Sequence, residues 1–305
     1  MSMRYQAGIV LPGYNALKVP DAPTIGTASG GSGSASVTFT APSDIGGGAI
    51  TGYSVVSTPG GLVGTGASSP VTVSGLTAGT AYTFKVFATN AYGPSPLSGA
   101  SNSATPLPAI GSAYQGGYYA GQISTAGNSI ADYNLVVGPL ASAQSFLTWK
   151  NANTGTTGAG SVIDGPQNTA DLVAAGNSTV FPAAHFCNDL STGGQTDWYM
   201  PAQNELEVCY YNLKPTTQSN VTSSGANVNA VPARASNYTT GNPTQTSAAN
   251  FVVTTGTEAF KSSNQYWAST QVSSRGRYIA FYSGQQFNYS NINNHYVRAI
   301  RRVAV

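Results

Sequence analysis

The segment DWYMPAQNELEVCYYNL, residues 197–213, predicts a helix at the centre of a domain. It opens with the aromatic pair Trp198-Tyr199. Pro201 stands where a helix would start, because its fixed φ and missing N–H suit the first turn. Apolar side chains then recur at helical spacing, at Leu206, Cys209, Tyr210 and Leu213. Most other segments are rich in Gly, Ser, Thr and Asn, so we expect this helix to be the spine of its domain.

The length and composition of the chain limit the classes of protein to which it can belong. A length of 305 residues predicts two domains. Only 7% of the residues are charged, against about 25% in ordinary globular proteins, yet the 18 tyrosines argue against disorder. A net charge of +2 is too small for a general nucleic-acid binder. No apolar run approaches the roughly 18–20 residues of a membrane helix. We therefore expect neither a nucleic-acid partner nor membrane insertion.

The first 18 residues are too short to fold alone and lack the pattern of a signal peptide. The protein is thus expected to be made in a cytoplasm. This end is either a mobile terminus or an anchor that docks on another protein. The candidate anchor residues are Tyr5, Ile9, Val10, Leu11 and Tyr14.

Residues 19–107 carry short alternating segments separated by turn residues, as in a β-sandwich. The ITGYSV strand and the run GLTAGTAYTFKVFATNAYGPS resemble a fibronectin type III domain, in which Tyr82 would be the corner tyrosine. Phe39 stands where that family usually has Trp, and it can fill the same core. Such domains are most often spacers or binding modules, and no catalytic constellation is present.

Residues 108–305 mix strands with short helices. Residues 115–123 and 132–137 predict a hairpin, and 145–149 a further strand. Helices are expected at 169–175, capped by Asn168 or Thr169, and at 182–190. Residues 216–250 are long and polar, which favours a functional loop. Four more strands are expected, at 266–270, 277–281, 284–287 and 296–303.

The order of four motifs in this second region, DWYMPAQNEL, YWAST, FYSG and YVRAIRRV, resembles the Lcl C-terminal (DUF1566) family of bacteria and phages. The resemblance implies an α+β C-type-lectin-like fold, related to the ligand-displaying domains of phage tropism proteins. The expected fold is thus an all-β fibronectin type III sandwich followed by an α+β C-type-lectin-like domain. Tyr199-Met200 departs from the Arg-Leu that is usual in the motif.

The motif residues are expected to be structural. We expect Trp198 and Trp267 to pack against Leu206 and Leu213. A buried Glu205 needs a cationic partner, for which Arg298 is the candidate. The predicted core motif comprises Trp198, Pro201, Glu205, Leu206, Trp267 and Arg298.

No enzymatic constellation emerges from the sequence. Cys187 and Cys209 are expected on inward helix faces as thiols in contact, with a disulfide as the alternative. His185 and His295 have no further ligands in register for zinc and no serine nucleophile nearby. A glycan-cutting enzyme would need paired carboxylates, and no pairing is evident among Asp189, Asp197, Glu205, Glu207 and Glu258. We expect no catalytic residues, no metal and no cofactor.

The stretch YSGQQFNYSNINNHY, residues 282–296, has the composition of an antibody paratope. Tyrosines give contact area at low entropic cost, and nearby arginines suit carboxylate or phosphate groups. The alternative is an ordinary polar loop. The candidate ligand-binding residues are Arg275, Arg277, Tyr282, Gln285, Gln286, Asn288, Tyr289, Asn291, Asn293, Asn294, His295 and Tyr296.

These features and the resemblance predict a phage virion protein that displays a lectin-like domain for non-covalent host adhesion. It would be a fibre, tail or decoration component located in the virion, forming a homo-oligomer. Its partners would be other virion proteins, through the N-terminus, and a bacterial surface glycan or protein. The alternative is a purely structural decoration, neck or tail protein whose lectin-like domain contacts other virion proteins.

Overall fold

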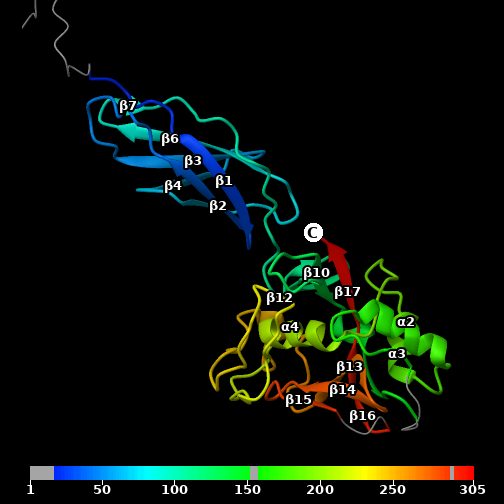
Figure 1. Cartoon of the computed structure of the whole chain (residues 1–305). Helices are drawn as coiled ribbons and strands as arrows, with labels where there is room; N and C mark the ends of the chain where they lie inside the picture. Colours follow the sequence, from blue (N-terminus) through cyan, green and yellow to red (C-terminus); the bar gives the residue numbers. More distant parts are fainter. Residues whose placement is uncertain (1–16, 152–156, 289–291) are drawn as a thin grey trace, which may run out of the picture. The chain divides into compact units, whose positions relative to one another are not determined.

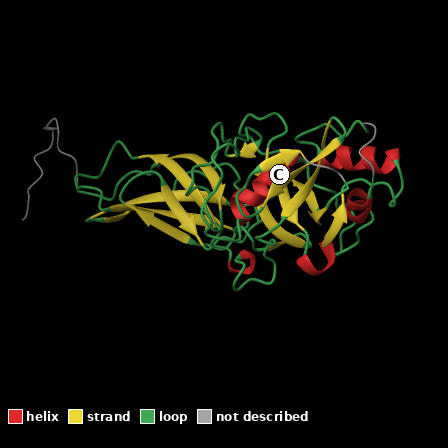
Figure 2. Ribbon diagram, turned by 90° about the horizontal axis from the view of Figure 1, so that it is seen from below, coloured by secondary structure: helices red, strands yellow, loops and turns green. Residues whose placement is uncertain are grey.

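The computed structural model describes residues 17–151, 157–288 and 292–305. The chain divides into two compact units, Met1–Ala109 and Ile110–Val305, which Figure 1 shows with their labelled elements. Every helix among these described residues belongs to the second unit; Figure 2 colours the helices red. The candidate anchor residues Tyr5, Ile9, Val10, Leu11 and Tyr14 lie outside the described residues.

The first unit contains two sheets. One has the order β1-β2-β5, and the other has the order β4-β3-β6-β7. The strand bounds are β1 Thr24–Gly31, β2 Ser34–Thr40, β3 Gly52–Thr58, β4 Val63–Gly66, β5 Val71–Ser74, β6 Thr83–Asn90 and β7 Gly93–Pro94. All pairings in both sheets are antiparallel.

The sandwich follows from the period-two pattern of the sequence. Alternate residues of β2, β3 and β6 are buried and build one core, because successive side chains of a strand point to opposite faces. Phe39 packs on Tyr53 with ring centroids 4.7 Å apart, filling the site expected for a larger aromatic. The hydroxyl of Tyr82 accepts a hydrogen bond of 3.1 Å from the backbone N–H of Thr77, which is the predicted tyrosine corner.

The second unit contains two five-stranded sheets. One has the order β12-β9-β10-β17, with β8 pairing to β9, and the other has the order β11-β16-β13-β14-β15. The strands are β8 Ala113–Tyr114, β9 Gly117–Ile123, β10 Tyr133–Val137, β11 Gln144–Thr148, β12 Ala230–Val231, β13 Gln265–Val272, β14 Arg275–Ala280, β15 Gln286–Asn288, β16 Asn294–Arg298 and β17 Ile300–Ala304. The helices are α1 Leu140–Ala143, α2 Gly165–Ala175, α3 Pro182–Asn188 and α4 Gln203–Leu213, with a 3₁₀ turn at Ala249–Phe251.

Helix α4 is the spine that the sequence predicted, but it begins later. Pro201 precedes the helix, and Ala202 is the N-cap. The Glu205 carboxylate accepts from the backbone N–H of Ala202 at 2.8 Å and so closes the first turn. Eight of the eleven helix residues are buried, so α4 is covered on most of its circumference.

Two other predicted boundaries were wrong. Helix α2 begins at Gly165, because Asp164 rather than Asn168 or Thr169 caps it, with its side chain accepting from Gln167 N. The predicted terminal strand 296–303 is two strands: β16 and β17 flank Ala299 and belong to different sheets. The side chains of the RAIRR segment therefore enter different surroundings.

The core of the second unit is divided into two clusters, because neighbouring residues of β13 point to opposite faces. Leu206, Leu213 and Tyr266 belong to one cluster, whereas Trp198 and Trp267 belong to the other. The expected packing of the two tryptophans on the leucines of α4 was therefore wrong. Period-two alternation sends Trp267 away from the face that Tyr266 shares with the helix.

The two cysteines follow the same division. Both are free and buried, Cys187 in the tryptophan cluster and Cys209 in the α4 cluster. The expected contact between the thiols was wrong, and they form no disulfide. Burial raises the pKa of both thiols and so disfavours the reactive thiolate.

Candidate ligand-binding edge

Arginines of the second unit fall into two groups. Four of the six form ion pairs with carboxylates: Arg234 with Glu207, Arg298 with Glu258, Arg301 with Asp197, and Arg302 with Glu205. The guanidinium groups of the other two, Arg275 and Arg277, form no side-chain hydrogen bond or ion pair with the residues that the structure describes, and Arg277 Nε is buried without a partner there.

The partner predicted for Glu205 was wrong. Its carboxylate accepts from Arg302 Nε at 2.8 Å and from the Tyr199 hydroxyl at 2.6 Å, in addition to Ala202 N. Burial raises the pKa of Glu205, and the charge of Arg302 opposes that shift. With these three donors on a fully buried carboxylate, Glu205 has a structural role.

Arg298 instead neutralises Glu258. Its Nη2 donates to Glu258 Oε2 at 2.8 Å, its Nη1 to the Glu258 carbonyl at 2.6 Å and its Nε to the Gly138 carbonyl at 2.9 Å. The guanidinium also lies 4.9 Å from the centroid of the Phe260 ring. Arg298 is therefore a buried, fully satisfied cation that joins three segments of the fold.

The long polar region 216–250 is attached to α4 by a second buried carboxylate. Glu207 accepts from the Tyr238 hydroxyl and from Asn227 Nδ2, both at 2.6 Å, and from Arg234. The Arg234 guanidinium also lies 3.9 Å from the centroid of the Tyr211 ring. This attachment was not predicted from the sequence, although an acidic residue within the largely apolar helix α4 could have indicated it.

Region 216–250 also packs beside the turn between β14 and β15. Backbone Val221 N donates to Ser283 O at 2.9 Å, and Gln286 N donates to Ser224 Oγ at 3.2 Å. Gln203, at the start of α4, donates its side-chain amide to Gln286 Oε1. The predicted site residues Tyr282, Gln285 and Gln286 therefore lie half-buried at a turn that α4 and the loop hold in place.

Arg275 and Arg277 lie on the strand that this turn follows. Their alternate positions in β14 point their side chains to the same face. Arg277 is the cross-strand partner of Asn288, which is exposed. Burial lowers the pKa of Arg277, because desolvation disfavours its charged form, and no carboxylate among the described residues pairs with it. An unpaired, partly desolvated cation of this kind suits an anionic group from outside.

Aromatic rings occupy the other face of the hairpin. Tyr278 pairs with Phe287 across the strands, with ring centroids 5.5 Å apart, and Phe287 is 36% exposed. His295 lies 4.5 Å from the Trp267 ring and 5.0 Å from the Tyr278 ring. Burial lowers the pKa of His295 to about 4, so this imidazole is neutral at pH 7.

Other members of the predicted set divide between surface and interior. Asn293 and Asn294 are exposed at the start of β16. Tyr296 is half-buried and stacks on Tyr266, with centroids 5.6 Å apart. Tyr289 and Asn291 lie outside the described residues. We refer below to Arg275, Arg277, Phe287 and Asn288 as the β14–β15 edge.

The described side chains of this edge are hydrogen-bond donors and an aromatic ring. Among residues 17–151, 157–288 and 292–305, no group of three His, Cys, Asp or Glu side chains could hold a metal ion. Within the same ranges, no helix has the length and apolarity needed to cross a membrane. What the edge offers is guanidinium and amide donors on one face and aromatic surface on the other.

Comparison with known proteins identifies part of the chain. Residues 21–103 match the fibronectin type III domain family. A solved structure of titin kinase and its flanking domains is 30% identical, covering 29% of this chain and 17% of that chain, with a TM-score of 0.26. A structure of titin domains A168–A170 is 31% identical, covering 29% and 32%, with a TM-score of 0.26. A human domain described as the fourth FNIII domain is 23% identical, covering 36% and 97%, with a TM-score of 0.27.

The chain thus spans about a sixth to a third of the length of those titin structures. No curated protein sequence matches it. The family match, the two antiparallel sheets and the tyrosine corner agree with one another. Residues 21–103 are a fibronectin type III domain.

Proposed function

We propose that this chain is a phage virion protein, a fibre, tail or decoration component, whose second domain is C-type-lectin-like and binds the bacterial surface non-covalently. The fibronectin type III domain acts as a spacer that carries this domain away from the particle. The virion origin rests on the resemblance of residues 108–305 to the Lcl C-terminal family.

The topology of the second domain supports a lectin-like fold. Its early strand β10 pairs antiparallel with its last strand β17, so the two ends of the domain are joined in one sheet. The motif stretch before α4 is attached to the same strand, because Tyr199 and Ile300 exchange backbone hydrogen bonds of 2.9 and 3.0 Å. The motifs therefore build the scaffold, and binding is left to the segments that the scaffold presents.

The observation that carries the proposal is that Arg275 and Arg277 have no carboxylate partner among the described residues. In a chain with only 7% charged residues, the four other arginines of the second domain each have a carboxylate partner. A half-buried guanidinium without a counter-charge costs free energy, which an anionic or acceptor-rich ligand recovers on binding. The exposed Phe287 ring adds apolar area on the opposite face of the same hairpin.

The proposed ligand is an acceptor-rich surface glycan or protein segment that carries carboxylate or phosphate groups. Binding of such a ligand to the β14–β15 edge of a single chain would be weak. Many copies on one particle would convert weak contacts into firm attachment, because later contacts become intramolecular.

Binding of the full chain to intact bacteria and to purified virion proteins tests the proposal. We expect the fluorescently labelled protein to bind cells of a susceptible strain and to be displaced by polysaccharide extracted from those cells. A protein that binds capsid, neck or tail proteins strongly but no cells of a susceptible strain would contradict adhesion and leave the purely structural alternative.

A further inference from the structure

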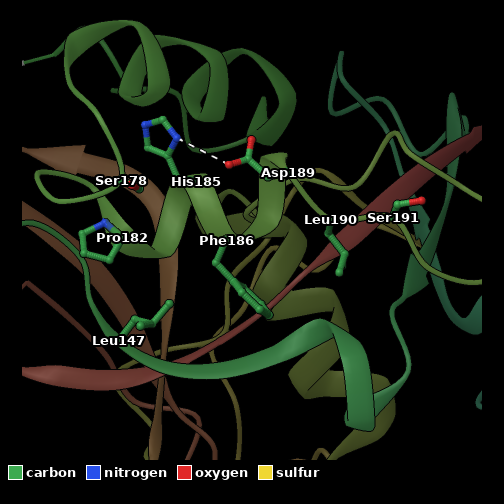
Figure 3. Close-up of a pocket in the computed structure, with 8 residues that line it drawn as sticks. All are labelled: Leu147, Ser178, Pro182, His185, Phe186, Asp189, Leu190 and Ser191. Carbon is green, nitrogen blue, oxygen red and sulfur yellow. Dashed lines mark ion pairs between the residues drawn. The ribbon is translucent and has the colours of Figure 1, made fainter.

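A separate hollow lies on α3, among residues that the β14–β15 edge does not use. Its volume is about 450 Å³, and Figure 3 shows the side chains that surround it. The lining residues are Leu147, Ser178, Pro182, His185, Phe186, Asp189, Leu190 and Ser191. A hollow of this size is within the range of small-molecule sites.

The floor of the hollow is apolar because of helix and strand periodicity. Pro182, Phe186 and Leu190 recur every four residues and therefore share one side of α3 and its C-terminal end. Leu147 reaches the same hollow from β11, whereas the preceding Phe146 packs on Tyr296 instead. These side chains are half-buried rather than buried, so the hollow keeps an accessible apolar surface.

The rim of the hollow carries two acceptors side by side. His185 Nε2 lies 2.7 Å from the Gly176 carbonyl oxygen, so Nε2 carries the hydrogen and donates it. When the ring is uncharged, Nδ1 is therefore an acceptor, and it lies 3.8 Å from Asp189 Oδ2. Figure 3 shows the two side chains pointing toward each other on one side of the helix.

Both acceptors line the hollow, where the side chain of His185 is 16% exposed. The side chain of Asp189 is 66% exposed, and its other oxygen accepts from Asn188 Nδ2 at 2.9 Å. The distance between Nδ1 and Oδ2 is too long for a direct hydrogen bond. Two neighbouring hydroxyl groups can each donate to one acceptor while the ring that carries them lies on Phe186.

We propose that this hollow binds a neutral pyranose through a pair of adjacent hydroxyls, as a second ligand site of the chain. The Asp189 carboxylate disfavours acidic sugars, which distinguishes this site from the arginine-bearing β14–β15 edge. The apolar face of the sugar ring covers Phe186 and Leu190, and two charge-assisted or imidazole hydrogen bonds fix its orientation.

Nuclear magnetic resonance of the full chain tests this site directly, because the sequence contains only two histidines, His185 and His295. The probes are methyl α-glucopyranoside, methyl β-galactopyranoside and methyl α-mannopyranoside, titrated at constant pH. We expect at least one of them to shift the His185 ring resonances and to leave those of His295 unchanged. Asp189→Asn should weaken that binding at least tenfold, since one acceptor is replaced by an amide.

The matched control is Asp171→Asn, a carboxylate on α2 that accepts from Gln167 and does not line the hollow. It should bind the sugar as the unaltered chain does. Shifts of His295 alone, no shift with any of the three glycosides, or equal weakening by both substitutions would each overturn the second site. None of these results bears on the arginines of the β14–β15 edge, whose test uses cells.

Discussion

Replacing Arg298 by Met would remove the cation that holds β16, Glu258 and Gly138 together. The substitution keeps most of the side-chain length but deletes three hydrogen bonds, of 2.6, 2.8 and 2.9 Å. It leaves the Glu258 carboxylate, 11% exposed, without its counter-charge. Removing one member of a buried ion pair typically costs about 3–5 kcal/mol, because the remaining charge stays desolvated.

Tryptophan fluorescence reports this loss for the second domain alone. All three tryptophans, at 149, 198 and 267, lie in residues 110–305. Urea unfolding followed at these residues should show a free energy of unfolding lower by about 3–5 kcal/mol. For a domain of this size, the melting temperature should fall by roughly 2–4 °C per kcal/mol.

The matched control is Arg275→Met on β14, which β13 separates from β16; its guanidinium is exposed and has no ion-pair partner among the described residues. It should change the free energy of unfolding by no more than about 0.5 kcal/mol. If Arg298→Met cost less than about 1 kcal/mol, the value of an exposed ion pair, the argument that Arg298 is a buried structural cation would be refuted.

Three further predictions concern other parts of the molecule. His295 should titrate near its folded pKa of about 4 in proton resonance spectra. Because that pKa is lowered on folding, the free energy of unfolding that depends on neutral His295 is lost as pH falls from about 6.5 to about 4. The variant His295→Phe should lose less stability over the same pH range. Titration of His295 near pH 6.5 in the folded protein would contradict its burial. Cys187 and Cys209 should react with a thiol reagent only after unfolding, and modification of the folded protein would show that one is accessible. Tyr82→Phe should destabilise the fibronectin type III domain by about 0.5–1.5 kcal/mol, the value of one hydrogen bond; unchanged calorimetric melting would contradict the corner assignment.

Period-two alternation made the first domain predictable from sequence. In β2, β3 and β6, alternation fixes which side chains point inward, so the residues of the core follow from the pattern itself. The Tyr82 hydrogen bond is local in sequence, with a partner five residues away. Neither feature depends on contacts between distant segments.

The ion-pair partners in the second domain were less predictable, since they depend on such contacts. Arg298, Arg301 and Arg302 are close in sequence, and each can reach a carboxylate. The break at Ala299 places Arg298 in one sheet and the other two in another, and this decides the pairing. A sequence pattern that reads as one continuous strand contains no information about that break.

The residue types of the candidate site were predictable from the sequence, but the contacts that hold the site in place were not. Arg275, Arg277 and Asn288 were predicted from the residue types that flank a tyrosine- and asparagine-rich stretch. The attachment of loop 216–250 to α4 through Glu207 was missed, because its donors Asn227, Arg234 and Tyr238 lie in a polar segment without periodicity. Only the fold brings those donors to the helix.

Adhesion through the β14–β15 edge is tested most directly by cell binding of the double variant Arg275→Gln/Arg277→Gln. The control is Lys261→Gln, which removes an exposed cation elsewhere in the domain. Charge-assisted hydrogen bonds are worth about 1.5–3 kcal/mol each, so the double variant should bind a susceptible strain more than about tenfold more weakly. It should also lose the salt dependence of binding that the unaltered chain and the control share. Equal affinity and equal salt dependence for all three proteins would contradict the account.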